Sequence, residues 1–585
     1  MIREPNHGGS DVSSSAFPTT VGLRKQRVER HESANGRQGT DNDRIIVVSN
    51  RGPVNFNMDP DTGRFESQTG AGGVVSGLLS ATRRRPVTWI ALAMNDADRA
   101  IARAHEGGDG HSVREWPNIS LRLVDTPEDV YERYYDGVSN KALWFLQHYL
   151  LQPTHPFPAK LMRDWEDGYR MVNEMVGRAV VEELEAVGYD TPVLFQDYHL
   201  YLAPAVVRER LPWARLTHFI HIPWPEARYW ELAPEAMTQA IFAGLAANDI
   251  VGFQTERDAR NFLDGAQRFL PDATPADAAH DEVGALLVDD RRISARVYPI
   301  AVAPADVYAQ ANGEMSDETA ELLARARPTP GHKVILRVDR VEPTKNIVAG
   351  FRAYERMLQR HKRLRERVTF VALLVPSREG LAEYRAVMRE TQHIIERINE
   401  RYGTPTWQPI LAVFGNDRAR ALACMRQFDA LLVNPLLDGM NLVVKEGALV
   451  NERAGVVVLS RTAGAFEQVG RYALGVPPTD VDAISEALYQ ALTMSMPERR
   501  SRASGMLNIL LRESSTTWLQ AQLRDLATQT GRPQVVYGAT GAARPTPHVR
   551  SAADLLSRET IMAARHALMS PAPDTDDTLT TLGMP

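Results

Sequence analysis

Residues 436–460 read LLDGMNLVVKEGALVNERAGVVVLS, and the fold of the chain can be predicted outward from them. The apolar run ALLVNP overlaps the start of this stretch, and GVVVLS closes it; both runs are typical of buried strands. Between them, Asp438-Gly439 predicts a turn, and Asn441 stands where a helix over Leu442–Asn451 would begin. Strand, turn, helix and strand in succession indicate one unit of a parallel α/β sheet.

The predicted turn also suits a ligand. A strand that runs through a glycine turn into a helix N-terminus presents backbone N–H groups to an anion. Asp438 and Glu446 stand close by in the sequence, and ionised carboxylates accept hydrogen bonds from hydroxyl groups. A ligand that carries both an anionic group and a polyol is a nucleotide sugar. An ordinary βαβ unit with solvated charges explains this stretch equally well.

Bulk composition narrows the function classes. The 585 residues are 44% hydrophobic and 24% charged, which is enough for at least two globular domains. The net charge of −6 disfavours nucleic acid and anionic membranes as partners. Cys424 is the single cysteine, which excludes an internal disulfide and fits a cytoplasmic location. We expect no membrane helix, because no apolar run approaches the roughly 20 residues that one needs, and no secretory signal.

Strands and helices alternate in both halves of the chain and predict two doubly wound α/β domains. The expected boundaries are a disordered tail over 1–43, Rossmann-like domains over 44–305 and 306–496, helices over 497–532, and a mostly disordered tail over 533–585. A glycine loop before a helix over Val74–Thr82 would let a backbone approach a phosphate or sugar closely. Residues 95–130 look polar and irregular, and residues 134–144 mix aromatic with turn residues.

Polar side chains follow the predicted strands in both halves. They are Arg51, Asp197 and His221 in the first half, and Arg340, Lys345, Arg378 and Asp438 in the second. Each one alone is more simply explained as structural. Together they stand at carboxyl ends of strands, the edge at which such sheets bind ligands. Two such edges facing each other would form a cleft, and its four basic residues predict ligands with at least two anionic groups.

Ten ordered segments resemble one family. IIVVSNRGP, TGAGGVVSGL, YYDGVSNKALW, FQDYHL, HFIHIPWP, DIVGFQT, VYPIAV, DRVEPTKN, PSRE and DGMNLVVKE follow one another in the order found in trehalose-6-phosphate synthases. The resemblance runs from about Arg44 to Leu526. It implies a GT-B fold, in which two Rossmann-like domains face each other across a cleft. It also implies retaining transfer of glucose from a nucleotide sugar, with UDP-glucose first and GDP- or ADP-glucose next, to glucose 6-phosphate, without a metal or other cofactor.

The resemblance assigns the acceptor side by matching positions. Arg51 and Arg378 match the arginines that grip the acceptor phosphate, and guanidinium groups bind phosphate bidentately. Tyr135 and Trp144 match aromatic residues that line the acceptor pocket, and Asp197 matches a carboxylate on the acceptor sugar.

The donor side is assigned in the same way. The matched positions are Gly72 and Gly73 in the glycine loop beside the donor, His221 at the donor glucose, Arg340 and Lys345 at the diphosphate, Asp438 at the donor hydroxyls, and Leu442, Val443 and Glu446 at the nucleoside.

The family's chemistry implies front-side attack, in which the departing phosphate oxygen takes the proton of the acceptor. The residues expected at the reacting centre are Asp197, His221, Arg340 and Lys345. The two cations would stabilise the leaving diphosphate. Asp197 as a hydroxyl-binding carboxylate is the favoured interpretation, and Asp197 as a general base is the rival one.

Departures from the family pattern leave alternatives open. HIPWP replaces the usual HIPFP, EPTKN replaces DYSKG, and FQDYHL replaces HDYHL. HIPWP followed by Tyr229-Trp230, together with LVNER, also resembles pseudo-glycosyltransferases that build aminocyclitols, although those depart at DGMNLVVKE. The alternatives are another phosphorylated acceptor, such as glycerol 3-phosphate or an aminocyclitol phosphate, or an inactive sugar-sensing homologue. The sequence leaves the donor base and the formation of a homo-oligomer open.

Two acidic motifs do not fit the functions they suggest. Asp96-Ala97-Asp98 resembles a metal-binding DxD motif, but it follows no nucleotide-binding pattern. The acidic run at 574–578 resembles an aspartyl-phosphatase loop, but no apolar strand precedes it. We therefore expect neither a metal site nor a phosphatase activity.

Overall fold

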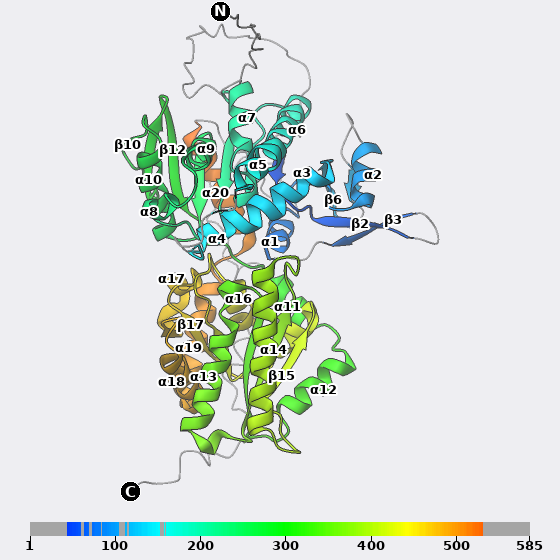
Figure 1. The fold of residues 1–585 in the computed structure, drawn as a ribbon, viewed down its shortest axis with the longest axis vertical. Helices are drawn as coiled ribbons and strands as arrows, with labels where there is room; N and C mark the ends of the chain where they lie inside the picture. Colours follow the sequence, from blue (N-terminus) through cyan, green and yellow to red (C-terminus); the bar gives the residue numbers. More distant parts are fainter. Residues whose placement is uncertain are drawn as a thin grey trace, which may run out of the picture. The chain divides into compact units, whose positions relative to one another are not determined.

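The computed structural model describes residues 44–59, 64–69, 73–83, 85–104, 111–113, 116–151, 157 and 159–530. The tails predicted over 1–43 and 533–585 lie outside the described residues, and so does Gly72 of the glycine loop. The domain boundaries drawn from the sequence therefore stay a prediction. The described residues form two large sheets and one hairpin (Figure 1).

The first sheet has ten strands in the order β10-β11-β12-β9-β8-β7-β1-β4-β6-β5. In chain order they are β1 (Ile45–Val48), β4 (Val87–Leu92), β5 (His111–Val113), β6 (Trp116–Val124), β7 (Val193–Gln196), β8 (Leu216–Phe219), β9 (Ile250–Phe253), β10 (Thr274–Ala276), β11 (Gly284–Val288) and β12 (Arg291–Val297). The strands from β12 to β6 pair in parallel, whereas β5, β10 and β11 pair antiparallel. The sheet is thus parallel throughout its centre and antiparallel only at its two edges.

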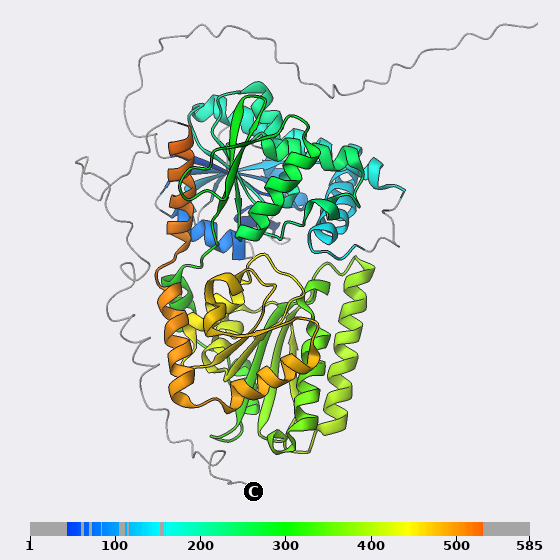
Figure 2. The ribbon, with the colours of Figure 1, turned by 90° about the vertical axis from the view of Figure 1, so that its left-hand side faces the viewer.

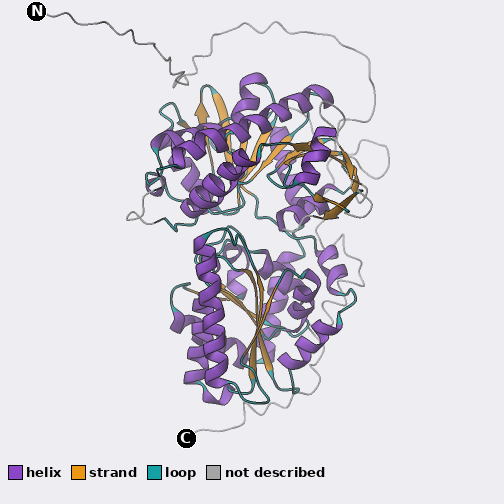
Figure 3. Cartoon of the chain, turned by 45° about the vertical axis from the view of Figure 1, so that its right-hand side comes forward, coloured by secondary structure: helices purple, strands orange, loops and turns teal. Residues whose placement is uncertain are grey.

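The second sheet has six strands in the order β15-β14-β13-β16-β17-β18, and all its pairs are parallel. The strands are β13 (Lys333–Arg340), β14 (Val368–Val375), β15 (Ile410–Phe414), β16 (Ala430–Val433), β17 (Val456–Ser460) and β18 (Leu474–Val476). Helices cover both faces of this sheet (Figure 3). Burial on both faces explains why β14 and β17 are continuous apolar runs in the sequence.

A two-stranded hairpin, β2 (Val54–Met58) with β3 (Phe65–Thr69), follows β1. The helices that accompany the first sheet in the chain are α1 (Gly73–Thr82), α2 (Asp96–Ala104), α3 (Glu128–Glu132), η1 (Arg133–Leu143), α4 (Trp144–Gln147), α5 (Leu161–Asp164), η2 (Trp165–Arg170), α6 (Met171–Val187), η3 (Tyr198–Leu200), α7 (Ala203–Arg210), α8 (Ala227–Trp230), α9 (Glu235–Ala246) and α10 (Glu256–Phe269).

The helices that follow are α11 (Pro304–Ala311), α12 (Asp317–Ala326), η4 (Pro343–Lys345), α13 (Ile347–Arg360), η5 (Lys362–Leu364), α14 (Ala382–Tyr402), α15 (Arg418–Gln427), α16 (Leu442–Val450), α17 (Ala465–Val469), η6 (Gly470–Tyr472), α18 (Val481–Thr493), α19 (Met496–Leu510) and α20 (Ser515–Gln529). Side-chain caps fix several of the starts. The hydroxyl of Ser514, for example, accepts from the backbone N–H of Thr517 in a capping box that opens α20. No helix in the described part of the chain combines the length and apolar character needed to cross a membrane.

Two expectations for the first half are wrong. Residues 95–130 are not irregular, because they contain α2, β5, β6 and the start of α3. Residues 134–144 are helical rather than turns, and most of them belong to the π-helix η1. Glycine explains this second error: a Cβ on Gly137 would lie 2.7 Å from Oδ2 of Asp164, and one on Gly168 would lie 2.7 Å from the backbone N of Tyr134. Gly137, which looked like a turn residue, lets η1 pack closely on the end of α5, and Gly168 lets η2 pack closely on η1.

The chain passes between the two sheets twice. It leaves the first sheet after β12 and enters the second through α11 and α12. It returns between α19 and α20, two helices that follow each other along one edge of Figure 2. Helix α20 then binds the first connection, where the indole Nε1 of Trp518 donates to the carbonyl of Tyr298 at 3.0 Å. The phenol of Tyr298 donates to Asp525 at 2.9 Å.

Asp429, directly before β16, holds the amino-terminal edge of the second sheet together. Its carboxylate is 1% exposed and accepts from Arg327 at 2.6 Å and from the backbone N–H of Val334 at 2.9 Å. Burial raises the pKa of this carboxyl, but Arg327, Arg499, Lys333 and Arg453 bring it well below its ordinary value. One carboxylate thus compensates four cations, of which Arg499 is buried and the other three are partly buried.

We predict that Asp429→Asn lowers the free energy of unfolding by about 3–5 kcal/mol, because it leaves buried cations uncompensated. Asp482→Asn is the matched control. Asp482 pairs with Arg356 and Arg360 but is 54% exposed, so its change should stay within about 0.5 kcal/mol. Urea unfolding followed by circular dichroism measures both. Equal stabilities of the two variants would contradict the role of Asp429.

Candidate functional site

The loop between β16 and α16, together with the first turns of that helix, carries four of the predicted site residues: Asp438, Leu442, Val443 and Glu446. Asn441 caps α16, its side chain accepting from the backbone N–H of Val444 at 3.4 Å with a φ of 80°. This is the left-handed region that asparagine tolerates better than most residues. The turn therefore leads directly from Asp438 into the first turn of the helix, where Leu442 and Val443 are half-buried. The sequence predicted this local arrangement.

Lys345 and Asp438 form an ion pair between two loops of the second sheet. The ammonium lies 2.5 Å from Oδ2 of Asp438, and both side chains are largely buried, at 13% and 16% exposure. Burial raises the pKa of Asp438, but Lys345 outweighs it, so the pKa lies below its ordinary value. Asn441 donates to the same oxygen at 3.1 Å. Asp438 is therefore held ionised, as a hydrogen-bond acceptor.

Gly439 brings this loop against the first sheet. A Cβ at Gly439 would lie 2.0 Å from the carbonyl oxygen of His221 and 3.2 Å from Cα of Ile222. Only a residue without a side chain permits this approach. The carboxyl end of β16 and the carboxyl end of β8 therefore meet at one point, as the sequence pattern predicted.

Asp197 and His221 come together at that same edge. Asp197, which follows β7, has a φ of 68°, and its Oδ1 accepts from the backbone N–H of His221 at 3.2 Å. Burial raises the pKa of Asp197 to about 7. Burial also lowers the pKa of His221 to about 3, so this imidazole is neutral, and its Nε2 lies 3.0 Å from Oε1 of Gln196. The carboxyl of Asp197 can exchange a proton near neutral pH, which its sequence context did not reveal.

Arg378, after β14, contacts Tyr384 on α14 of its own half and two aromatic residues of the first half, Tyr198 and Trp144. Its guanidinium donates to Tyr384 at 2.5 Å and to Tyr198 at 3.1 Å. Its central carbon lies 5.0 Å from the ring centroid of Trp144, within the range of a cation–π contact. The φ of 44° at Arg378 is uncommon for this residue type, and such strain is often found at functional sites.

Arg51, after β1, lies near Arg378. The exposed guanidinium donates to the phenol oxygen of Tyr135 at 3.2 Å. Tyr135 raises the pKa of Arg51, whereas Arg378 acts in the opposite direction, which means that the two like charges repel each other. Tyr135 also stacks on His199 with ring centroids 5.8 Å apart. The acceptor-side residues predicted from the sequence thus come together, with two cations on aromatic side chains.

Arg340 differs from the other predicted residues. Its side chain is 53% exposed and pairs with the buried Glu342 at 2.7 Å. Burial raises the pKa of Glu342, but Arg340 and other cations outweigh it, and the pKa is lowered overall. Arg340 is directed to this carboxylate rather than to Lys345 or Asp438. The guanidinium of Arg340 pairs with this one carboxylate and, because it is exposed, remains accessible to a ligand.

The site contains residues that sequence reasoning missed. Arg418, at the start of α15, lies 2.9 Å from Oε1 of Glu446, the residue predicted for the nucleoside. Burial raises the pKa of Glu446, and Arg418 opposes this shift. Tyr198, Tyr384 and Glu342 were also missed. Tyr198 stands in the FQDYHL segment and Glu342 in DRVEPTKN, so their motifs could have found them, whereas no local signal marks Tyr384 or Arg418.

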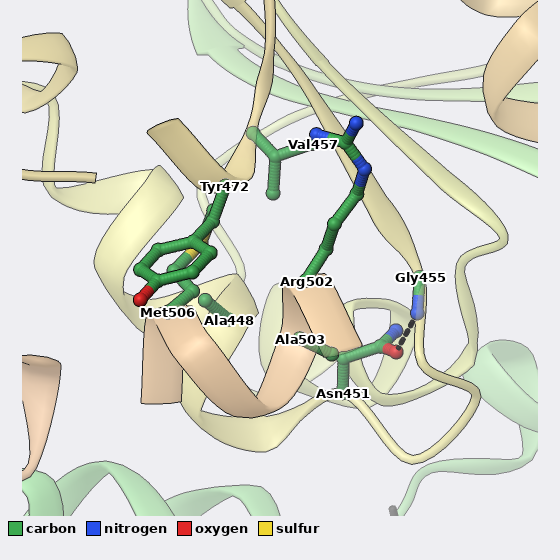
Figure 4. Close-up of a pocket in the computed structure, with 8 residues that line it drawn as sticks. All are labelled: Ala448, Asn451, Gly455, Val457, Tyr472, Arg502, Ala503 and Met506. Atoms are coloured by element: carbon green, nitrogen blue, oxygen red, sulfur yellow. Dashed lines mark hydrogen bonds between the residues drawn. The ribbon is translucent and has the colours of Figure 1, made fainter. Parts of the chain in front are cut away.

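No group of three or more His, Cys, Asp or Glu side chains that could hold a metal ion occurs among the described residues. Asp98 of the DxD-like motif is structural instead. Its carboxylate accepts from the backbone N–H groups of Phe56 and Met94, both at 2.9 Å. A small cavity between α16, β17 and α19 (Figure 4) offers only about 10 Å³, room for about one water molecule. None of the predicted site residues lines it.

The sequence model of glycosyltransferase family 20 matches residues 43–528. The chain belongs to glycosyltransferase family 20. Among curated relatives, a bifunctional trehalose-6-phosphate synthase/phosphatase from Thermoproteus tenax is 32% identical over 485 residues, which cover 81% of this chain and 62% of that protein. The family membership identifies the chain as a glycosyltransferase, as the sequence predicted.

Solved structures of this family have the same fold. One from E. coli, described as trehalose-6-phosphate bound with UDP-2-fluoro glucose, has a TM-score of 0.70 and 28% identity, covering 83% of this chain and 98% of that one. An α,α-trehalose-phosphate synthase (UDP-forming) from Burkholderia xenovorans in complex with glucose-6-phosphate has the same TM-score and identity, covering 82% and 99%. The predicted GT-B fold, with two Rossmann-like domains, is confirmed. The candidate site residues lie at the carboxyl edges of the two sheets of this fold.

We predict that Gly439→Ala destabilises this glycosyltransferase by about 1–3 kcal/mol, because the added methyl group overlaps the carbonyl of His221. Gly380→Ala is the matched control, since a Cβ there would meet no atom within 4 Å. Its effect should stay within about 0.5 kcal/mol. Urea unfolding compares the two, and a Gly439→Ala variant as stable as Gly380→Ala would mean that the approach to His221 is not tight.

Proposed function

We propose that this chain transfers glucose from UDP-glucose to glucose 6-phosphate and forms α,α-trehalose 6-phosphate. What supports this most is the pairing of Arg51 and Arg378 at one place. Two guanidinium groups that repel each other gain from an anion between them, and a phosphate can accept from both. The B. xenovorans relative, an enzyme of the same family and fold, is complexed with glucose-6-phosphate.

In this proposal the acceptor lies on aromatic side chains. Trp144 and Tyr135 would pack against the sugar ring while Arg51 and Arg378 hold its phosphate. Asp197 would accept a hydrogen bond from a sugar hydroxyl in its ionised form. Its pKa of about 7 means that this form is lost below neutral pH, so acceptor binding should weaken as the pH falls.

The donor would lie on the second sheet. Asp438 would accept from the glucose hydroxyls, Glu446 from the ribose hydroxyls, and Leu442 and Val443 would line the nucleoside. Lys345 and Arg340 would stabilise the diphosphate as the bond to glucose breaks. The E. coli relative is bound with UDP-2-fluoro glucose, which supports a UDP-sugar over the GDP and ADP alternatives.

We further propose that the reaction retains the anomeric configuration and proceeds in the cytoplasm without a metal ion. The neutral imidazole of His221 would lie beside the donor glucose and donate or accept a hydrogen bond without adding charge. Front-side attack assigns the acceptor's proton to the departing phosphate oxygen, so no protein base is required. Asp197, with its raised pKa, is the residue that could take that proton in the rival mechanism.

The direct test supplies purified protein with UDP-glucose and glucose 6-phosphate in excess EDTA. We expect release of UDP and formation of a non-reducing disaccharide phosphate, identified by NMR with α,α geometry. GDP-glucose, ADP-glucose, glycerol 3-phosphate and an aminocyclitol phosphate serve as comparison substrates. Loss of turnover in EDTA would contradict metal independence, and turnover only with another acceptor would replace the proposed one.

Substitutions of Arg51 and of Arg340 should change different kinetic constants. We expect Arg51→Ala to raise the KM for glucose 6-phosphate by roughly 10- to 100-fold, because the phosphate is bound alike in ground and transition states. Arg340→Ala should lower kcat by on the order of 10²–10³, because negative charge grows on the diphosphate during bond breaking.

Steady-state kinetics with each substrate varied in turn separates these effects, and melting curves check that both variants fold. Arg352→Ala is the matched control, because Arg352 pairs with Glu390 on an exposed surface and should behave as wild type. A rise only in the donor KM for Arg51→Ala, or a wild-type kcat for Arg340→Ala, would contradict the division into acceptor and donor sides.

A further inference from the structure

Lys445 is a buried cation that the proposed chemistry does not use. It lies on α16, the helix whose first turn carries Leu442 and Val443, and its side chain is 1% exposed. Its neighbour Glu446 pairs with Arg418. Burying a lysine is costly unless its ammonium finds partners. Where those partners come from therefore indicates what the lysine does.

Both contacts of Lys445 go to segments that connect the two sheets. The ammonium donates to the carbonyl of Ile300 at 2.6 Å, in the connection between β12 and α11. It also lies 3.6 Å from Oε2 of Glu513, in the connection between α19 and α20. A lysine that only supported its own helix would bond within the second sheet's layers. Lys445 instead ties one helix to both points at which the chain crosses between the domains.

These two connections are themselves anchored. The backbone N–H of Ile300 donates to Oε1 of Gln254 at 2.9 Å, next to the start of α10. Glu513 accepts from Nε2 of Gln468 on α17 at 2.8 and 3.0 Å. A shift of α16 would thus be transmitted to residues of both domains. Transmission needs such a continuous set of packed and hydrogen-bonded groups.

We propose that Lys445 is a positioning residue that couples the donor-binding helix α16 to both interdomain connections, so that nucleotide binding at the helix tightens the joint between the domains. The inference rests on the proposed function, because it takes the first turn of α16 to be the nucleotide site. Lys445 touches no reacting group. It acts through the helix that does.

Hydrogen–deuterium exchange of the full-length chain, with and without UDP, tests the coupling without requiring turnover. In the wild type, UDP should slow exchange about three- to tenfold in peptides covering residues 298–303 and 510–516, as well as at the start of α16. In Lys445→Met, UDP should still protect α16, but the two connecting peptides should exchange at the same rate with and without it.

Two further variants test whether the effect is specific to the contacts of Lys445. Lys333→Met is the matched control, because Lys333 is a partly buried lysine that lies 3.7 Å from Asp429 and touches neither connection. It should keep the wild-type response in both peptides. Glu513→Gln retains the bond to Ile300, so only the 510–516 peptide should lose its response, and this variant replaces Lys445→Met if the latter fails to fold.

A pH series distinguishes coupling through Lys445 from a purely structural role of this residue. The charged group facing Lys445 is Glu513, while the Ile300 segment offers a carbonyl and α17 the neutral Gln468. Burial lowers the pKa of Lys445 to about 8. Above this pH the neutral amine loses the ion pair but still donates to Ile300. The ratio of the exchange rate without UDP to the exchange rate with UDP should therefore fall toward one in 510–516 as the pH rises through about 8. In 298–303 this ratio should stay above one.

Global unfolding would not produce this pattern. Because the folded pKa of Lys445 lies below the ordinary value of 10.5, the unfolded chain binds more protons between pH 8 and 10.5. This group therefore makes the fold more stable, not less, as the pH rises across that window.

The outcomes distinguish the two proposals. Equal UDP-dependent protection of the connections in wild type and Lys445→Met, with α16 protected in both, would overturn the coupling and leave the proposed function intact. If UDP protects no part of the wild-type chain, the proposed function fails, and the coupling fails with it. A response lost equally in Lys333→Met would overturn the specific role of Lys445.

Discussion

The structure of the site depends on the close approach of two backbones. The loop at Gly439 packs on the carbonyl of His221 at a distance that leaves no room for a side chain. This contact joins the carboxyl edge of the six-stranded sheet to the carboxyl edge of the ten-stranded sheet. Asp438 precedes Gly439 in the chain. On the other side of the contact, Asp197 accepts a hydrogen bond from the backbone N–H of His221. The groups of both domains are therefore fixed relative to one another by main-chain geometry, which is stiffer than contacts between long side chains.

Charge at the site is arranged in compensated pairs with one exception. Lys345 with Asp438, Arg340 with Glu342 and Arg418 with Glu446 each oppose a cation to a carboxylate. Arg51 and Arg378 instead face phenol oxygens and each other. The two like charges repel each other. Such an arrangement is reasonable where a dianionic group binds, because the ligand then supplies the missing negative charge.

The sequence predicted the strands that end at the site because they are apolar on both faces and stop at polar or turn residues. It missed the helices between residues 95 and 130 and the π-helix over Arg133–Leu143. In the first region the apolar residues are sparse, so periodicity gives a weak signal. In the second, Gly137 looks like a turn residue but serves a close contact with Asp164. Local propensity cannot distinguish these uses of glycine, since only the partner helix decides between them.

The family, the GT-B fold and the order of polar residues at strand ends can be predicted from the sequence alone, because ten segments keep both their composition and their order. Which residues face one another, and how they ionise, follows from the folded arrangement. Tyr384 is distant in sequence from Trp144, yet their ring centroids lie 5.9 Å apart, and no local pattern indicates this contact or the pairing of Arg418 with Glu446. The pKa of about 7 at Asp197 is likewise a product of burial. Desolvation and pairing depend on the atoms that surround a group, and a linear sequence does not specify them.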